Sequence, residues 1–205
     1  MKFEDTEVWG FEHAIRGMRN PMESWNKSDS FIISPHNYYV IGPNDMKLMK
    51  TLIKAGPEHR KFLRQIFISV DITAPLYWWK EFDTYKVGTV ADSCSTMHKL
   101  KDTSITMDCF EMGDYCGFFE TPWKNLIALL EQCRKEYNET KDKRYWKELI
   151  RLLPESWLQK RTVTMSYENV ANMYSQRMNH KLTEWSKDFI QWADNLPYFK
   201  ELFTV

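Results

Sequence analysis

One stretch of the sequence, residues 65–86, constrains the fold most, because a strand pattern runs directly into a helix pattern. Gln65–Ile72 (QIFISVDI) is apolar and rich in β-branched side chains with partial alternation, which is typical of a strand. Pro75 then suits the first position of a helix, where its missing N–H costs nothing. Large side chains follow at three- to four-residue spacing up to Phe82. We therefore expect a strand over Gln65–Ile72 and a helix over Pro75–Lys86.

Amphipathic patterns and one further β-branched run follow along the rest of the chain. Val8–Met18 carries a short apolar pattern, Arg161–Met165 is β-branched enough for a second strand, and Asp102–Thr121 has no helical period, so we expect it to be irregular with at most a short strand. We expect one helix that begins at a cap formed by Asn44 or Asp45 and ends at Gly56-Pro57. Four more helices are expected over Thr121–Asn138 (with Thr121 as N-cap), Asp142–Leu153, Tyr167–Met178 and Leu182–Leu196. This alternation predicts a single domain of residues 1–205, of the α/β (α+β) class, with a central, mostly antiparallel sheet flanked by helices.

Composition narrows the class of protein. With 205 residues, 43% of them hydrophobic and 15% aromatic, the chain is neither disordered nor collagen-like. Its 28 basic and 28 acidic residues cancel, which argues against nucleic acid or an anionic membrane as the partner. The first twenty residues are charged throughout and no apolar run is long enough to span a membrane, so we expect a cytoplasmic protein. Nine Trp and twelve Phe lead us to expect a homo-oligomer with aromatic side chains at its contacts.

The four cysteines and five histidines show no metal-binding spacing, because neither a CxxC pair nor an HExxH motif occurs, and we predict no metal site. Cys109 and Cys116 either form a bridge, act together as ligands, or are buried or idle thiols, and we favour buried or idle thiols in a cytosolic chain.

The segment Thr89–Thr96 is a run of small polar residues. It is either a loop whose open backbone N–H groups hold an anionic or hydroxylated ligand, or a solvated connection.

From Ala74 to Met97 the chain resembles, without a gap, the signature A-P-I-F-V-x-R-Q-W-x-R-H-R-x-x-S-x-N-E-x-S-x-R-Y of the flavin-dependent thymidylate synthases (the ThyX family). Thr84-Tyr85-Lys86 falls on R-H-R, and Asp92, Cys94 and Thr96 fall on the E, S and R that follow. Two more places carry the resemblance. Glu148–Pro154 is similar to the family's E-x-x-R and Leu-Pro step, although one residue shorter, and counting from Pro154 places Arg177 on the family's second phosphate-binding Arg. Counting back from Ala74 places His59 on a family His before the strand.

The resemblance implies a ThyX-like fold and a homotetramer that binds FAD and dUMP at a subunit interface. Such a transferase moves a methylene carbon from methylenetetrahydrofolate to the uracil ring, with reduced flavin supplying hydride and with folate and NADPH as co-substrates. The residues at matching positions are Glu81, Asp92, Cys94, Thr96, Arg151 and Arg177 for the substrate and His59, Thr84, Tyr85 and Lys86 for the cofactor, with no catalytic residue identified.

The sequence also departs from the family. Thr84-Tyr85-Lys86 loses guanidinium groups whose bidentate geometry a lysine does not copy. Two functions therefore stay open: an enzyme that methylates or hydroxymethylates a pyrimidine nucleotide at C5, or an inactive nucleotide-binding or protein-interaction module that has lost FAD. Several of these residues have an alternative, purely structural explanation. His59 is then an exposed histidine in a turn, Arg151 and Arg177 form surface ion pairs, and Lys86 stabilises the end of a helix as a cation. Cys94 is either a nucleophile or, as we prefer, a packed small residue.

Overall fold

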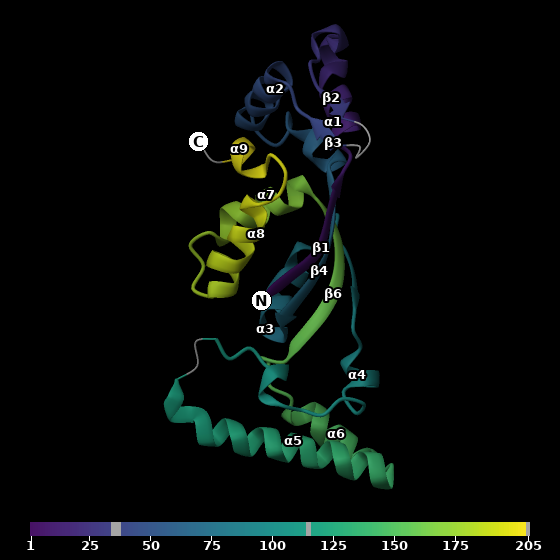
Figure 1. The fold of residues 1–205 in the computed structure, drawn as a ribbon, viewed down its shortest axis with the longest axis vertical. Helices are drawn as coiled ribbons and strands as arrows, with labels where there is room; N and C mark the ends of the chain where they lie inside the picture. Colours follow the sequence, from purple (N-terminus) through teal and green to yellow (C-terminus); the bar gives the residue numbers. More distant parts are fainter. Residues whose placement is uncertain (34–37, 114–115, 204–205) are drawn as a thin grey trace. The chain divides into compact units, whose positions relative to one another are not determined.

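The computed structural model describes residues 1–33, 38–113 and 116–203 (Figure 1). A central antiparallel sheet with strand order β1-β4-β6-β5 is flanked by helices, which confirms the predicted fold class. Its strands are β1 (Lys2–Trp9), β4 (Phe67–Pro75), β5 (Val90–Ser93) and β6 (Leu158–Ser166). A separate two-stranded sheet pairs β2 (Phe31–Ile33) with β3 (Tyr38–Val40) antiparallel.

The α-helices are α1 (Phe11–Arg19), α2 (Pro43–Lys54), α3 (Leu76–Phe82), α4 (Thr96–Lys99), α5 (Glu120–Thr140), α6 (Lys143–Leu152), α7 (Tyr167–Arg177), α8 (Ile190–Asp194) and α9 (Phe199–Phe203). A π-helix, Glu184–Phe189, leads directly into α8. Short 3-10 helices span Asn20–Met22, Trp25–Lys27, Lys61–Gln65, Asp83–Tyr85, Met107–Cys109 and Gly117–Phe119. None of the helices in the described part of the chain combines the length and apolar composition that a membrane crossing requires.

The chain forms two compact units. Unit 1 comprises Met1–Lys2, Asp71–Thr84 and Ala91–Thr162, and unit 2 comprises Phe3–Val70, Tyr85–Val90 and Val163–Val205. Strands β4 and β6 contribute residues to both units. The organisation as one domain stays a prediction.

Unit 1 contains the predicted helical hairpin. Helices α5 and α6 pack side by side (Figure 1), and Asp142 caps α6 by accepting a hydrogen bond from the Arg144 N–H. Leu130, Cys133 and Leu149 pack in its core. The predicted cap of α5 was wrong: Phe119 is the N-cap and Thr121 lies inside the helix. Pro122 is tolerated there because the first turn of a helix needs no backbone donor.

Unit 2 contains α2, whose start was also mispredicted. Gly42 is the N-cap and Pro43 the first helical residue, and the backbone N–H groups of Asn44 and Asp45 donate to the Asp29 carboxylate. The cap therefore comes from a residue 15 and 16 positions away from the two donors, which local patterns do not reveal. The end of the helix is as predicted, because Gly56 adopts φ 106° just after it.

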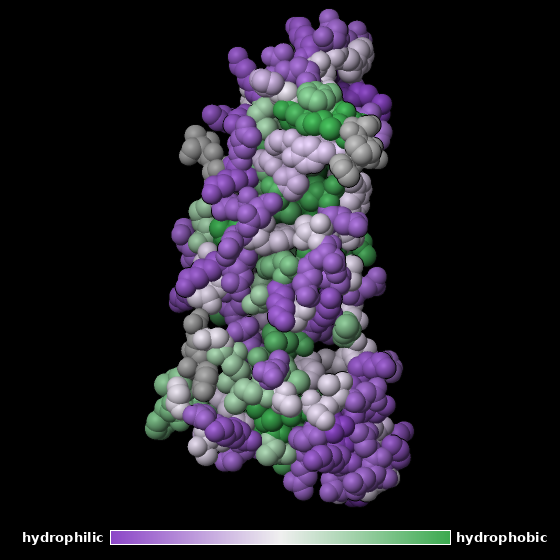
Figure 2. All heavy atoms as spheres, in the orientation of Figure 1, coloured by the Kyte–Doolittle hydropathy of each residue, from purple (hydrophilic) through white to green (hydrophobic). Residues whose placement is uncertain are grey.

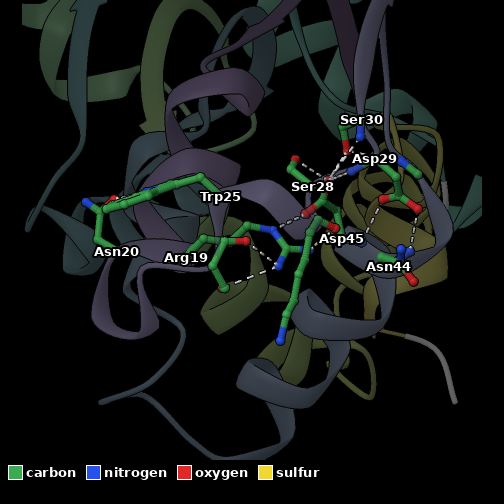
Figure 3. A network of polar contacts seen from close by, with 11 residues as sticks. Arg19, Asn20, Trp25, Ser28, Asp29, Ser30, Asn44 and Asp45 are labelled. Atoms are coloured by element: carbon green, nitrogen blue, oxygen red, sulfur yellow. Dashed lines mark hydrogen bonds and ion pairs between the residues drawn. The ribbon is translucent and has the colours of Figure 1, made fainter.

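Asp45 itself faces inward and anchors a buried polar network (Figure 3). Its Oδ1 accepts from Arg19 Nε at 2.6 Å, and its Oδ2 accepts from the backbone N–H and hydroxyl of Ser30 and from the Ser28 hydroxyl. Arg19 and Asp45 are 4% and 0% exposed, so this ion pair lies in the interior of unit 2. It joins α1, α2 and the segment between Trp25–Lys27 and β2.

Four further expectations change. Strand β4 runs Phe67–Pro75, so it begins and ends later than predicted, and Gln65 belongs to the preceding 3-10 helix. Strand β6 runs Leu158–Ser166 and extends beyond its predicted range at both ends. The pattern at Val8–Met18 covers the end of β1 as well as most of α1, and β1 was missed. The helix predicted over Leu182–Leu196 is a π-helix followed by α8. Its apolar face is nevertheless buried as expected, at Trp185, Phe189, Trp192 and Ala193.

The expectation that Thr89–Thr96 is a loop throughout is wrong, because Val90–Ser93 forms strand β5, and ligand binding by this segment stays a prediction. All four residues of β5 are exposed, so no alternation of buried and exposed side chains marked it in the sequence. Its place at the edge of the sheet beside β6 supplies the backbone pairing that composition did not indicate. The region Asp102–Thr121 is irregular as expected in its described residues, with short 3-10 helices and one bridge between Phe110 and Trp157.

Candidate functional site

The residues singled out from the sequence divide between the two units. Unit 1 holds Glu81, Thr84, Asp92, Cys94, Thr96 and Arg151, and unit 2 holds His59, Tyr85, Lys86 and Arg177. Each group is described within its own unit.

A cavity of about 410 Å³ in unit 1 brings together Cys94 and Thr96, two of the predicted substrate residues. Cys94 follows β5 and Thr96 begins α4, whose N-cap Ser95 accepts from the His98 N–H. The backbone N–H of Cys94 donates to the Lys160 carbonyl at 2.9 Å, and its carbonyl accepts from Gln159 Nε2 at 2.9 Å. The free thiol is exposed, so its interpretation as a packed small residue is wrong.

The charges around this cavity are largely balanced within unit 1. Lys160 pairs with Asp71 at 2.9 Å, Lys99 with Asp102 at 3.4 Å, and the N-terminal ammonium with Glu111 at 3.8 Å. A hydrogen bond from Thr162 and the nearby Lys160 lower the pKa of Asp71, so this carboxylate is ionised beside its lysine. The cavity therefore offers polar partners for a base or sugar more readily than net charge for a phosphate.

Arg161 is a charged residue of unit 1 that the sequence analysis treated only as part of a strand. Its guanidinium lies 4.2 Å from the Trp79 ring centroid, donates from Nη1 to Asp83 at 2.9 Å and donates from Nε to Gln159 Oε1 at 3.0 Å. Gln159 also lines the cavity. The signal for such a residue was its place in the Gln159–Arg161 run of long polar side chains at the start of a β-branched strand.

The other predicted residues of unit 1 lie apart from these contacts. The Thr84 hydroxyl donates to the Glu81 carbonyl at 2.7 Å, and Asp92 is exposed on β5. Arg151 is 55% exposed and pairs with Glu148 three residues earlier on α6. This is the surface ion pair that the alternative interpretation of Arg151 predicted.

In unit 2 the structure brings Tyr85 and Arg177 together. Arg177 Nε donates to the Tyr85 hydroxyl at 2.9 Å, and that hydroxyl donates to Gln176 Oε1 at 3.0 Å. The guanidinium also lies over two rings, 5.4 Å from the Tyr85 centroid and 4.9 Å from that of Trp185. A residue matched to the cofactor and a residue matched to the substrate therefore form one cluster, and the sequence analysis had not assigned Trp185 to a site.

His59 lies elsewhere in unit 2, in an exposed turn after α2. It lines a cavity of about 480 Å³ together with Lys61 and the apolar side chains of Leu48, Leu52 and Phe62. Glu58 also lines this cavity, so its carboxylate offsets the Lys61 cation, and the lining is a mixed polar rim beside an apolar wall.

The side chains of Thr84-Tyr85-Lys86 are not suited to bind the diphosphate of a flavin dinucleotide tightly. Both hydroxyls are engaged by protein groups, so the segment offers one exposed cation, Lys86. A buried dianion needs several charge-assisted partners. We therefore derive no catalytic step through a flavin at this segment.

Within residues 1–33, 38–113 and 116–203, no three His, Cys, Asp or Glu side chains are grouped closely enough to hold a metal ion.

Solved structures share this fold, among them two crystal structures of ThyX. A crystal structure of the flavin-dependent thymidylate synthase ThyX from Helicobacter pylori complexed with FAD and dUMP matches with a TM-score of 0.76 and 16% identity, over 100% of this chain and 98% of that chain. A second crystal structure of ThyX from Helicobacter pylori, with FAD and dUMP, matches with a TM-score of 0.77 and 17% identity over the same shares. No family model and no curated protein matches the sequence. The predicted ThyX-like fold is confirmed, and at this identity the likeness carries the fold alone.

Proposed function

We propose that the chain is a flavin-dependent thymidylate synthase-like protein that acts on dUMP or a related pyrimidine nucleotide, by methylation or hydroxymethylation at C5. The observation that carries the proposal is the end-to-end match to ThyX structures that hold FAD and dUMP. The resemblance to the family is the reason for proposing a folate as the carbon donor, reduced flavin as the hydride donor and NADPH as a co-substrate. The chain's own residues are assigned to binding and not to a chemical step.

Arg177 is the proposed phosphate residue with the strongest local support. Its guanidinium is half-buried beside Tyr85 and Trp185, an environment in which a charge-assisted contact with a phosphate is screened less by water than at the surface. Arg151, in unit 1, is also proposed as a phosphate-binding residue, although its exposed ion pair with Glu148 gives it weaker support. Glu81, Asp92, Cys94 and Thr96 are proposed partners of the base and sugar, and His59 and Lys86 of the cofactor.

The test is dUMP binding measured by calorimetry on the parent chain and on Arg177→Ala. Each charge-assisted contact contributes roughly 1.5–3 kcal/mol, so we expect at least about tenfold weaker binding in the variant. Thermal melting of the unliganded variant shows whether it folds, because the change also removes the contacts of Arg177 with Tyr85 and Trp185. Equal binding by both proteins would remove Arg177 from the site, and no binding by the parent would reject the proposed function.

A second candidate function is a nucleotide-binding or protein-interaction module that has lost FAD. The engagement of both hydroxyls of Thr84-Tyr85-Lys86 favours it. A flavin titration of the purified protein separates the two functions. A yellow protein that binds FAD supports the enzyme, and a colourless protein that FAD does not reconstitute supports the module.

We further propose a homo-oligomer, a homotetramer by the resemblance. In unit 2 the small sheet of β2 and β3 exposes Phe31, Ile32, Ile33 and Tyr38, each between 47% and 56%. Figure 2 shows hydrophobic atoms at the surface around these strands. Contiguous exposed apolar side chains are typical of contact surfaces between proteins.

A further inference from the structure

The Tyr85 side chain makes two hydrogen bonds that tie it to the last turn of α7. Its hydroxyl accepts from Arg177 Nε at 2.9 Å and donates to Gln176 Oε1 at 3.0 Å. A phenol hydroxyl has one proton to donate, and that proton is committed to Gln176. Tyr85 is therefore oriented toward α7, and its hydroxyl has no proton left for a cofactor.

The segment that carries Tyr85 is attached to α7 at a second point. Asn169, in the first turn of α7, donates from Nδ2 to the Val87 carbonyl at 2.7 Å. The same Asn169 completes the capping box with Ser166 at the start of the helix. Both ends of α7 thus hold the segment that follows Thr84, which fixes the Tyr85 backbone relative to Arg177.

Trp185 forms the second wall around the Arg177 guanidinium. Its ring is fully buried, lies 6.3 Å from the Tyr85 ring in an edge-on arrangement, and packs on Phe189 at 5.2 Å. It belongs to the π-helix Glu184–Phe189. Such π-turns are rare, and they recur at functional sites because they re-aim side chains that a regular helix would direct elsewhere.

These contacts restrict an otherwise flexible side chain. A free arginine loses considerable rotamer entropy when it binds a ligand, and a guanidinium already held between two rings loses less. A cation over a Trp or Tyr face is stabilised by the ring quadrupole, and the directional bond at Nε fixes the rotation of the guanidinium plane.

We propose that Tyr85 and Trp185 are positioning residues that set the orientation of Arg177 for the phosphate of a pyrimidine nucleotide. The inference rests on the proposed function, because it takes Arg177 as the phosphate residue. It reassigns Tyr85 from the cofactor to the substrate side. It also assigns a role to Trp185, which the sequence analysis placed only on the buried face of a helix.

The test is a double-mutant cycle on the full chain, with dUMP affinity measured by calorimetry in the parent, Tyr85→Phe, Arg177→Ala and the double variant. Tyr85→Phe keeps the ring and removes the hydroxyl that orients the guanidinium, so we expect about fivefold to tenfold weaker dUMP binding, a smaller loss than removal of the guanidinium itself. In the Arg177→Ala background the same change should have no further effect, since its partner is gone. Trp185→Phe, which keeps a smaller aromatic face, should weaken binding less than Tyr85→Phe.

The outcomes separate the inference from the proposed function. Parental affinity in Tyr85→Phe, or equal losses from Tyr85→Phe with and without Arg177, would overturn the positioning role and leave the nucleotide site standing. Full affinity in Arg177→Ala would also overturn it. A parent that does not bind dUMP would reject the proposed function and this inference with it. Thermal melting of each variant without ligand shows whether it folds, and Tyr85→Phe remains informative if Trp185→Phe does not.

Discussion

Arg19 and Asp45 form a buried ion pair in which Nε donates to Oδ1 across 2.6 Å, although 26 residues separate them in sequence. Burial raises the pKa of Asp45, but the hydroxyls of Ser30 and Ser28 and the Arg19 guanidinium outweigh it and hold that pKa below its ordinary value. Asp45 is therefore charged in the folded protein. The pair links α1 to α2 and organises the segment from Ser28 to Ser30.

We predict that Asp45→Ala lowers the free energy of unfolding by about 3–5 kcal/mol, because Arg19 is then buried without its counter-charge. Urea unfolding at neutral pH measures the loss. The matched control is Glu148→Gln, which breaks the exposed pair with Arg151 and should cost about 0–1 kcal/mol. Similar losses in both variants would show that the buried pair is no more important than a surface pair.

Substitution of Gly10 is predicted to lower the free energy of unfolding because of the local backbone geometry. Its φ is 96°, and an added Cβ would lie 2.1 Å from the Gln65 carbonyl oxygen. Gly10→Ala should cost about 1–2 kcal/mol for the left-handed backbone and roughly 1–3 kcal/mol more for the clash. Gly56 has φ 106°, and no neighbouring heavy atom lies within 4 Å of such a Cβ. Gly56→Ala should therefore lower the free energy of unfolding only through the strained backbone conformation. Denaturant unfolding of the two variants compares these costs directly, and equal losses would contradict the clash.

The ionised Glu131 carboxylate is predicted to make the free energy of unfolding of the protein sensitive to acid, through its contacts in unit 1. Hydrogen bonds from Arg134, opposed by partial burial and helped by the Ile105 N–H, lower the pKa of Glu131 from its ordinary 4.5 to about 2. Since the folded state favours the ionised form, its stabilisation is complete above pH 4.5 and is lost as the pH falls toward 2. The unfolding free energy of Glu131→Gln should therefore lie below that of the parent at pH 7, and the difference should shrink on acidification. A constant difference across this range would contradict the assignment.

The proposed oligomer predicts that light scattering coupled to size-exclusion chromatography gives a mass above that of one chain. The reason for this prediction is that β2 and β3 expose apolar side chains, which are typical of contact surfaces between proteins. Phe31→Lys should lower the mass if these strands form the contact, because a charge in an apolar interface is costly. A monodisperse monomer of the parent would count against the homo-oligomer itself.

Patterns with a local cause were predicted well. The existence of strand β4, the α5–α6 hairpin and the glycine end of α2 follow from side-chain periodicity and backbone freedom, although β4 begins and ends later than predicted. The misses have non-local causes. Strand β5 lies beside β6 without a buried face of its own, and the cap of α2 comes from Asp29.

The candidate site shows the same limit. The family-like motif identified Tyr85 and Arg177 separately, but no pattern in the sequence links them to each other or to Trp185. Tyr85 and Arg177 lie 92 positions apart in sequence, and Trp185 lies in a π-helix, whose extra residue per turn leaves no periodic signal over so short a segment. Arg161 was missed because its partners Trp79 and Asp83 lie about eighty residues earlier.

The last prediction concerns the segment that falls on the family's R-H-R. Thr84→Arg, Tyr85→His and Lys86→Arg introduced together should raise FAD affinity, because two guanidinium groups able to grip phosphate bidentately replace one ammonium and one hydroxyl. The same triple variant removes the phenol that accepts from Arg177 Nε, so it should at the same time weaken dUMP binding by about fivefold to tenfold. Fluorescence titration with FAD and calorimetry with dUMP measure the two effects, and Tyr85→Phe is the control that removes only the hydroxyl. If FAD binding is undetectable both before and after the change, the flavin pocket is absent and the module without FAD becomes the better description. If FAD binding rises while dUMP binding stays at the parental level, Tyr85 does not position Arg177.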